Sequence, residues 1–391
     1  MDSYKWFAPT RVLFGSGMLG RLHKQKMPGR KALLVISNGK SARTNGALEK
    51  TVDELEKAGV EYVLFDKVSS NPVKSVVEEG AQAVRDQGCD FVVALGGGSV
   101  MDSAKVIAMF APQPGDLWDY AGGATGKRQR LVEPVLPWVA ITTSAGTGSE
   151  VDNAGVITKP ETNEKIGIGG YESMFAKIAV VDPELMKTVP PQYTAYQGFD
   201  ALFHSIEGYI ANVHNFMGDM IELEAIRNIA KYLPRAVKDG SDMEAREHVA
   251  FANTMSGYSM VVSACIGEHS MEHAMSAFHK GLPHGAGLIM ISVAYFRFWI
   301  EKHVCDERFI DMARAMGKED ADRPEDFIDA LQQLQKDCGV DDLKMSDYGI
   351  RKEECLDMAV NAMDTMMMLF KCDPGEMTVE ECAQVFEKAY R

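Results

Sequence analysis

The sequence predicts a parallel α/β domain followed by an all-helical domain. Two observations predict this fold class. In the first 190 residues, short β-branched runs alternate with amphipathic stretches, which is typical of βαβ units and a largely parallel sheet. After Pro190 and Pro191, β-branched runs almost disappear and long helical periodicities take over. Because 391 residues exceed one typical core, we expect two domains, at 1–187 and 188–391.

The elements of the first domain follow from its apolar runs. Glycine, Asp or Asn usually follows each run, as a turn between a strand and a helix requires. Six strands are expected, at 10–14, 32–37, 61–66, 90–95, 137–142 and 177–182. Amphipathic helices are expected at 46–59, 74–88 and 100–110.

The second domain shows helical periodicity almost throughout. Its clearest helices are expected at 194–211, 218–237, 245–264, 326–338 and 378–390. The chain has no internal repeat, which argues against a solenoid.

Composition excludes several classes of protein. A net charge of −15 argues against nucleic-acid binding, which needs clustered Lys and Arg. The N-terminus lacks the apolar core of a signal peptide, and the longest apolar stretch is too short to span a bilayer. The seven cysteines are scattered and form no C-x-x-C pair, so we expect free thiols and a cytoplasmic location, with no membrane partner.

Three glycines directly follow the buried strand DFVVAL. In the sequence GGGSVMDSAK, Gly97, Gly98 and Ser99 lead into a helix, with Ser99 expected as its N-cap. Glycines let a pyrophosphate approach the backbone, and the N–H groups of a helix N-terminus attract anions. This favours phosphate binding over a purely structural turn and makes the domain Rossmann-like, although Met101 replaces the third glycine of the usual fingerprint.

Two further stretches bear on this interpretation. GSGMLG at 15–20 fits G-x-G-x-x-G, but no acidic residue follows at the required distance, so we interpret it as a tight turn. The stretch WVAITTSAGTGSEV at 138–151 is another strand followed by hydroxyl and glycine residues. Its Thr142, Thr143, Thr147 and Ser149 are expected to hydrogen-bond a second part of the same nucleotide.

Four of the nine histidines lie between residues 265 and 284, namely His269, His273, His279 and His284. A metal site, an acid–base site and a chance cluster all compete as explanations. HSMEH is not the zincin motif, because Ser270 stands where a Glu is required. His284, between a proline and a glycine, is expected on a turn.

A possible partner for these histidines lies at 198–209. Asp200 and His204 are one helical turn apart and share a face, and a buried Asp needs a partner. With His269 and His284 they would give one oxygen and three nitrogen donors, a set that suits Fe²⁺ or Zn²⁺. No cysteine is expected nearby.

Taken in order and at these separations, GGGSVMDSAK, TTSAGTGSE, GFDALFHSIE and the histidine segment resemble the iron-dependent (group III) alcohol dehydrogenases. The resemblance extends over essentially the whole chain and includes RVLFGSG, the turn at Asn71 and PHGAG at 283–287. The loop between His273 and His284 is one residue longer than in many members and contains His279.

The resemblance implies roles for individual residues. It makes Asp200, His204, His269 and His284 the metal ligands, with Fe²⁺ favoured and Zn²⁺ the alternative, and assigns His273 to proton transfer. The implied cofactor, NAD or NADP, would be bound by Ser37, Asn71, Gly97, Gly98, Ser99, Asp102, Thr142, Thr143, Thr147 and Lys165. Because no carboxylate stands at Ser37, where family members that prefer NAD carry Asp, NADP is slightly favoured.

The implied reaction is hydride transfer between the nicotinamide and a small primary alcohol or aldehyde whose oxygen is bound to the metal. A homodimer is implied as well. Three alternatives stay open: a polyol dehydrogenase of the glycerol type, a lyase resembling dehydroquinate synthase, and a non-catalytic metal- or nucleotide-binding protein. The sequence does not identify the substrate.

Overall fold

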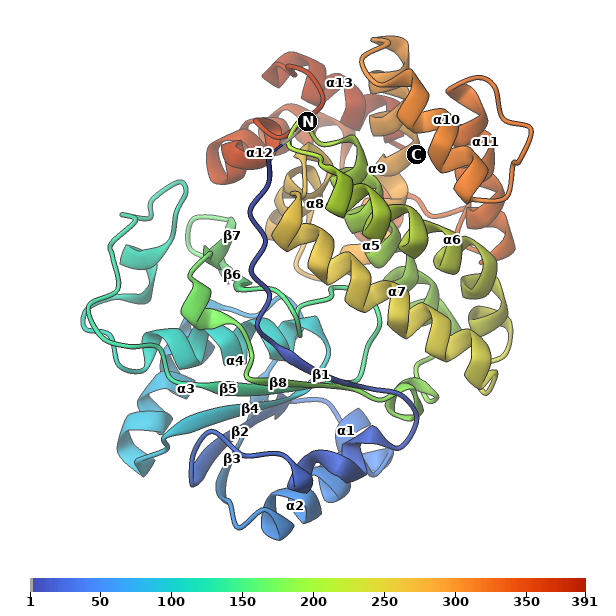
Figure 1. The fold of residues 1–391 in the computed structure, drawn as a ribbon. Coiled ribbons are helices and arrows are strands. Elements are labelled where there is room, and N and C mark those ends of the chain that lie inside the picture. The colour runs from blue at the N-terminus through green and yellow to red at the C-terminus, as the bar shows by residue number, and fades with distance from the viewer. Residues whose placement is uncertain (1–2) are drawn as a thin grey trace. The chain divides into compact units, whose positions relative to one another are not determined.

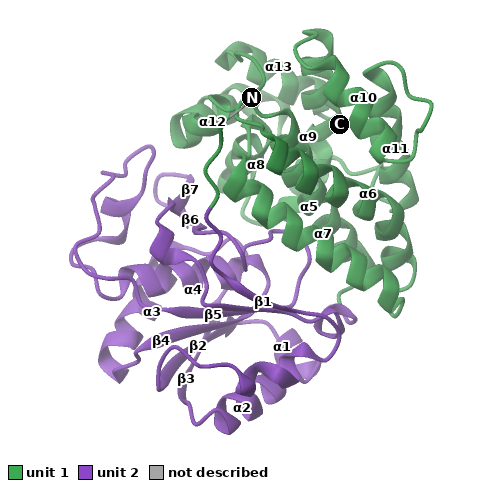
Figure 2. Ribbon diagram, viewed as in Figure 1, with its two compact units in different colours: residues 1–6, 189–391 green, residues 7–188 purple. Residues whose placement is uncertain are grey.

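The computed structural model describes residues 3–391 and divides into two compact units (Figure 2). One unit comprises residues 7–188 and the other residues 3–6 and 189–391. The first is an α/β unit and the second is helical (Figure 1). The predicted fold class is therefore confirmed.

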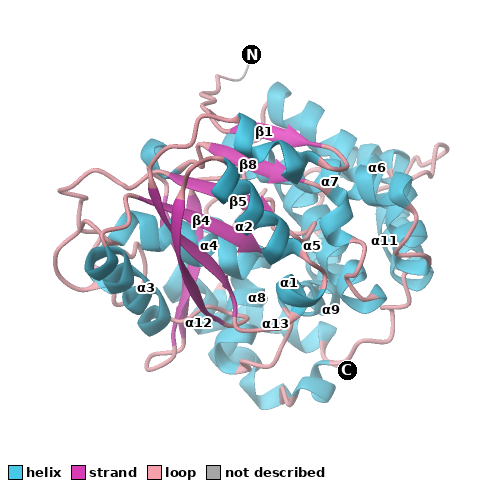
Figure 3. Cartoon of the chain, turned by 90° about the horizontal axis from the view of Figure 1, so that it is seen from below, coloured by secondary structure: helices cyan, strands magenta, loops and turns pink. Residues whose placement is uncertain are grey.

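A six-stranded sheet, parallel throughout, forms the centre of the α/β unit. Its strand order is β1-β8-β5-β4-β2-β3, with β1 at one edge (Figure 3). Each strand begins within one residue of its predicted start. The strands are β1 (Arg11–Phe14), β2 (Lys31–Ser37), β3 (Glu61–Val68), β4 (Phe91–Gly96), β5 (Trp138–Thr142) and β8 (Ile178–Val181).

Helices cover both faces of this sheet. α1 (Ser41–Thr44) and α2 (Ala47–Lys57) lie on one face, and α3 (Lys74–Gln87) and α4 (Gly98–Phe110) lie on the other (Figure 1). On the first face, alternate strand residues such as Leu34 and Val93 pack against Leu55 of α2. The chain runs from β2 to β3 on one side and then crosses back to β4 on the other side of β2. The carboxyl ends of β2 and β4 therefore form a topological switch point, where open α/β sheets bind ligands.

A second, two-stranded sheet was not predicted from the sequence. β6 (Ala154–Lys159) and β7 (Glu164–Gly169) form an antiparallel hairpin, with Asn163 in its turn at a φ of 50°. Thr158 of β6 donates its backbone N–H to the carbonyl of Pro72. The hairpin is thereby joined to the loop that follows β3.

The GSGMLG segment is a turn, as predicted. Gly15 and Gly17 have φ angles of 124° and 78°, which glycine adopts readily. The Asp182 carboxylate accepts the backbone N–H groups of Gly17, at 3.1 Å, and Leu19, at 3.0 Å. The polar contacts of this turn therefore go to the chain itself.

A lysine is completely buried beneath the hairpin. The Lys105 ammonium group forms an ion pair with Asp152 and donates to Ser149 Oγ, at 3.0 Å, and to the Ala154 carbonyl, at 2.6 Å. Burial raises the pKa of Asp152 to about 6, although Lys105 opposes this shift. The network joins α4 to the chain that leads from β5 into β6.

The second unit is entirely helical over its described residues. Its long helices are α5 (Pro191–Ile210), α6 (Phe216–Lys238), α7 (Met243–Val262), α8 (Gly267–Phe278), α9 (His284–Glu301), α10 (Asp306–Ala315), α11 (Glu325–Asp337), α12 (Cys355–Phe370) and α13 (Val379–Ala389). Short 3₁₀ helices occur in both units. Those of the α/β unit are Met18–Lys24, Leu117–Tyr120, Glu172–Met174 and Pro183–Met186, and those of the helical unit are Met345–Tyr348 and Lys352–Glu354. No single helix within residues 3–391 is long and apolar enough to cross a membrane; α7 and α8 qualify only as a pair bent by 106°.

Replacing Lys105 with Met should destabilise the protein by about 3–5 kcal/mol, because removing one partner of a buried ion pair leaves the other charge unpaired. Urea unfolding followed by circular dichroism measures the loss. The matched control is Lys67→Met, which breaks a solvent-exposed ion pair with Glu79 and should cost little. Equal losses in the two variants would contradict the role given to Lys105.

Candidate functional site

The glycine turn stands at the carboxyl end of β4. β4 ends at Gly96, Gly97 is the N-cap, and α4 begins at Gly98. The prediction that Ser99 is the N-cap was wrong, since Ser99 lies inside the first turn of the helix. No described side chain caps α4. The first N–H groups of the helix are therefore left for an anion.

The glycines also allow the turn to pack closely against the next loop. A Cβ at Gly97 would lie 3.0 Å from Ser144 Oγ, and one at Gly98 would lie 2.3 Å from Thr147 Cγ2. Larger residues would push this loop away. β4 and β5 are adjacent in the sheet, and Gly96 is in register with Thr142. The structure thus brings together the two stretches that the sequence assigns to one nucleotide.

The hydroxyl groups after β5 have unequal freedom to bind a ligand. Thr142 is buried and donates its hydroxyl to the Ser144 carbonyl, at 3.0 Å. Thr143 and Thr147 are only half-buried, and Thr147 Oγ1 accepts the Ser149 N–H at 3.3 Å. Thr143 and Thr147 are therefore better placed than Thr142 to reach a cofactor.

The other predicted cofactor residues lie in several elements of the same unit. Ser37 is the last residue of β2, at the switch point, and Asn71 adopts a φ of 50° in the loop after β3. Lys165 is buried in β7. Asp102 accepts the Ser149 hydroxyl, at 2.6 Å, and the Val156 N–H, at 2.9 Å, and burial raises its pKa. These bonds give Asp102 a structural role, and its contact with the cofactor stays a prediction.

The candidate metal centre lies in the helical unit. Asp200 and His204 occupy successive turns of α5, and His269 lies on α8. His284 was expected on a turn, but it is the first residue of α9, with Pro283 as N-cap. Three helices thus supply the four predicted ligands. All four side chains are buried except that of His284, which is partly exposed.

One carboxylate oxygen is the geometric centre of this cluster. His204 Nδ1, His269 Nε2 and His284 Nε2 each lie 3.5 Å from Asp200 Oδ1. These distances are long for hydrogen bonds. Among the described residues, Asp200 Oδ1 and His269 Nε2 are buried without a hydrogen-bond partner. Buried unsatisfied atoms facing one another fit a missing cation, and this donor set suits a divalent transition metal.

The imidazoles are oriented by carboxylates that the sequence analysis missed. His269 Nδ1 is hydrogen-bonded to Glu207, and His284 Nδ1 to Glu272. Both carboxylates are completely buried, and Glu207 also accepts the Ile266 N–H at 2.5 Å. Such outer carboxylates fix the tautomer and direct Nε2 toward a metal. Glu207 stands three residues after His204, and this spacing on one helix face was the signal that could have found it.

The charged groups of this cluster shift the pKa values of their neighbours. Burial acts to raise the pKa of Asp200, but the charges of His204 and His284 hold it well below its usual range. Burial acts to lower the pKa of His269, but Glu207 and Asp200 raise it to about 10. A cation binding here must therefore displace a proton from His269, so its affinity should weaken as pH falls.

Two glycines let ligand-bearing helices pack closely against a neighbouring helix. A Cβ at Gly198, two residues before Asp200, would lie 2.2 Å from Leu233 Cδ1 on α6. A Cβ at Gly285, next to His284, would lie 2.1 Å from the carbonyl oxygen of Tyr196 on α5. At Gly198 the Leu233 side chain would have to give way, whereas at Gly285 the neighbour is backbone, so a side chain there would force α9 and α5 apart.

The prediction that no cysteine lies near the centre was wrong. The Sγ atom of Cys265 and ligand nitrogens of His204 and His269 all lie within 4.8 Å of one another. His279, the extra histidine of the longer loop, instead lies 3.3 Å from Glu354 and joins none of the groups of possible ligands.

His273 lies beside the cluster. Its ring centroid is 5.4 Å from that of His284 and 6.3 Å from that of His269. Its Nδ1 atom is 2.9 Å from the thioether sulfur of Met366. The backbone of α12 is non-helical at Met366, with φ −134° and ψ 44°. The kink and the sulfur contact together place Met366 against His273.

Comparisons with known proteins find similar chains over the full length of the sequence. Residues 9–183 match the model of the iron-containing alcohol dehydrogenases, and residues 194–390 match that of the C-terminal domain of the Fe-containing alcohol dehydrogenase family. The 1,3-propanediol dehydrogenase of Klebsiella pneumoniae is 33% identical over 398 residues, which cover 99% of this chain and 100% of that protein. The NAD-dependent methanol dehydrogenase of Bacillus methanolicus is 32% identical over 98% of this chain and 99% of its own.

A solved structure is also similar over the full length. The archaeal halo-thermophilic alcohol dehydrogenase from a Red Sea brine pool has a TM-score of 0.94 and 34% identity, and the match covers 100% of this chain and 99% of that one.

Glu207→Gln keeps the size of the side chain but removes the charge that orients His269. We expect metal affinity to fall by about 10–100-fold, the usual cost of losing such an outer carboxylate. Equilibrium dialysis against a chelator, followed by elemental analysis, measures the affinity. Glu224→Gln, at an exposed position on α6, is the matched control, and His269→Ala gives the fully metal-free reference. An affinity equal to that of the parent would refute the orienting role.

Proposed function

The chain belongs to the iron-containing alcohol dehydrogenase family and is an NAD-dependent alcohol dehydrogenase, and we propose that it interconverts small primary alcohols and their aldehydes. Relatives are named for propanediol, methanol and butanol, which supports small alcohols as substrates. The proposed direction in the cell is reduction of the aldehyde.

One observation carries the proposal: a buried carboxylate oxygen of Asp200 surrounded by three imidazole nitrogens. We propose Asp200, His204, His269 and His284 as the ligands of one divalent ion. When bound, the ion would supply Lewis-acid chemistry at the substrate oxygen, and the nicotinamide would supply or accept the hydride. Glu207 and Glu272 hold the imidazoles of His269 and His284 in a fixed orientation and make them stronger donors.

His273 is proposed as the group that passes a proton between the substrate oxygen and solvent. A proton on Nδ1 of His273 is directed to the sulfur of Met366, at 2.9 Å. In that tautomer Nε2 is the unprotonated nitrogen, which can accept and return a proton. Met366 is therefore proposed as a positioning residue, which selects the useful tautomer of the imidazole.

The glycine turn and the switch point are proposed to hold the nicotinamide cofactor. The uncapped N-terminus of α4 suits its pyrophosphate, and Ser37 and Asn38 suit the ribose. Arg43 pairs with Asp66 at 2.5 Å, so its charge is partly neutralised, while Lys40 is exposed nearby. We propose that NADP(H) is used at least as well as NAD(H), with Lys40 as the contact of the 2′-phosphate.

Fe²⁺ is the proposed native ion and Zn²⁺ the alternative. Three imidazoles and one carboxylate bind either ion, so availability decides between them. Cys265 adds a thiol close to this donor set and would favour Zn²⁺ if it replaced a ligand.

We further propose a cytoplasmic homodimer. All seven cysteines are free, which supports a reducing compartment. β1 is an edge strand and pairs only with β8 among the described residues, which leaves its other edge available to a second copy.

A spectrophotometric assay tests the function directly. The protein loaded with Fe²⁺ under anoxic conditions should oxidise NADH or NADPH in the presence of butyraldehyde or glycolaldehyde, and the chelated protein should not. Absence of turnover with either cofactor, over a broad panel of aldehydes and at full metal occupancy, would reject the proposal.

His273→Ala should retain the metal and lower kcat by about 10²-fold, the usual loss when a proton-transfer group is removed. Metal content and kcat are measured on the same preparation across the pH range. His279→Ala is the control from the neighbouring loop and should leave both values unchanged. A kcat for His273→Ala equal to that of the parent at every pH would show that His273 has no part in the reaction.

Ser37→Asp should shift the preference toward NADH, because a carboxylate accepts from the ribose 2′-OH and repels a 2′-phosphate. The measurement compares kcat/KM for NADH and NADPH with one aldehyde in parent and variant. If the parent already prefers NADH by more than about tenfold, or 1.4 kcal/mol, the proposed use of NADP(H) is wrong.

A further inference from the structure

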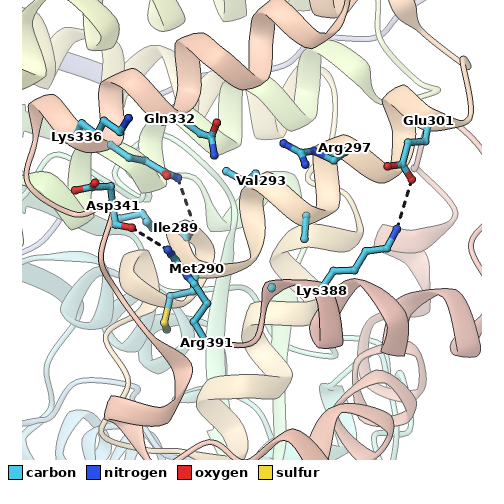
Figure 4. A pocket seen from close by; sticks show the side chains of 13 residues that line it. Ile289, Met290, Val293, Arg297, Glu301, Gln332, Lys336, Asp341, Lys388 and Arg391 are labelled. Atoms are coloured by element: carbon cyan, nitrogen blue, oxygen red, sulfur yellow. Dashed lines mark hydrogen bonds and ion pairs between the residues drawn. The ribbon is translucent and has the colours of Figure 1, made fainter.

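An open cavity lies at the surface of the helical unit, lined by residues of α9, α11, the chain after α11 and the last residues of the chain (Figure 4). Its volume is about 570 Å³, within the usual range for sites of small molecules. Its lining residues are Ile289, Met290, Val293, Ala294, Arg297, Glu301, Gln332, Gln335, Lys336, Asp341, Lys388, Ala389 and Arg391.

The charges around this cavity are opposite to those of the protein as a whole. Four cationic side chains line it, those of Arg297, Lys336, Lys388 and Arg391, against the carboxylates of Glu301 and Asp341. The chain as a whole carries a net charge of −15. A local excess of positive charge in an acidic protein is the electrostatic signature of an anion site.

Two of the four cations have no partner of their own. Lys388 lies 3.4 Å from Glu301, and Arg391 donates to the backbone carbonyl of Asp341 at 3.1 Å. Among the described residues, the side chains of Arg297 and Lys336 form no ion pair or hydrogen bond. Figure 4 shows the side chains of Arg297, Gln332 and Lys336 along one side of the cavity and those of Lys388 and Arg391 on the other. An anion between them would relieve their mutual repulsion.

The remaining lining residues limit the size and chemistry of the ligand. Ile289, Met290 and Val293 of α9 give the cavity an apolar part. The amide of Gln335 is already used, since it donates to Ser292 Oγ at 3.2 Å, whereas Gln332 has no side-chain hydrogen bond among the described residues. Cations, one free amide and a short apolar surface suit a compact organic oxyanion.

We propose that this cavity binds a small organic anion with at least two negative charges, held by Arg297 and Lys336 through its phosphate or carboxylate oxygens. Guanidinium groups bind both oxyanions through paired hydrogen bonds, and an ammonium adds a point charge. A nucleic acid is disfavoured, because the strongly acidic chain would repel it. The residues concerned are separate from the proposed metal ligands, so the site is additional to the proposed reaction.

Equilibrium dialysis of the metal-loaded protein at 0.15 M salt tests the proposal, with inorganic phosphate and succinate as probes and acetate as the monovalent comparison. NADH is kept at saturation so that phosphate cannot occupy the glycine turn. We expect one phosphate or one succinate per chain, at least tenfold tighter than acetate. Comparing phosphate with succinate distinguishes phosphate esters from dicarboxylates as the ligand class.

The variant for this test is Arg297→Gln combined with Lys336→Gln, which should weaken binding of the better probe at least tenfold and leave aldehyde reduction unchanged. The matched control, Arg21→Gln with Lys26→Gln, removes two exposed cations of the α/β unit and changes the net charge equally. Three results would overturn the proposal: no probe bound by the parent, acetate bound as tightly as the dianions, or equal loss of binding in the two double variants. If the first variant fails to fold, the single variant Lys336→Gln provides the same comparison against Lys26→Gln.

Discussion

The helical unit is organised around one buried carboxylate, that of Asp200, on which three histidines converge. Asp200 Oδ1 lies 3.5 Å from nitrogens on each of three histidines and has no hydrogen-bond partner among the described residues. Burying such a charge is expensive unless a cation or proton neutralises it. Two further buried carboxylates, Glu207 and Glu272, stand behind the imidazoles. Because the candidate ligands come from α5, α8 and α9, these three helices must pack so that the ligand side chains converge on one small volume.

Much of the fold was predictable because its signals are local. Each of the six parallel strands is a short apolar run, and its start could be placed within one residue. The β6–β7 hairpin was missed because its strands are rich in glycine and charged residues, as in EKIGIG. Its place depends on distant contacts, such as that between Thr158 and the Pro72 carbonyl. Ser99 was predicted to be the N-cap of α4, but Gly97 occupies that position. No sequence rule decides which of two nearby residues caps a helix.

The candidate site was predictable where side chains share a helix and unpredictable where they meet across helices. The spacing of Asp200 and His204 and the histidine-rich segment suggested one set of candidate donors, and the family resemblance then assigned them as metal ligands. Glu207 and Glu272 resembled ordinary helix carboxylates, and nothing in the sequence showed that both are buried. Cys265 was missed because it precedes α8, and helical spacing does not predict where a side chain outside the helix points. Met366 approaches His273 only because α12 is kinked there.

The close contacts at Gly198 and Gly285 have a consequence for redesign of the centre. The proposed donor atoms would determine which ion binds, whereas these glycines determine how near the helices can come, and the two properties are encoded at different positions. Exchanging a donor, for example to recruit Cys265, would therefore change the chemistry while leaving the spacing intact. A substitution at Gly285 would do the reverse, moving α9 away from α5 while the set of candidate donors stays unchanged. A library designed to change the metal preference should therefore randomise the donor positions and keep the glycines constant.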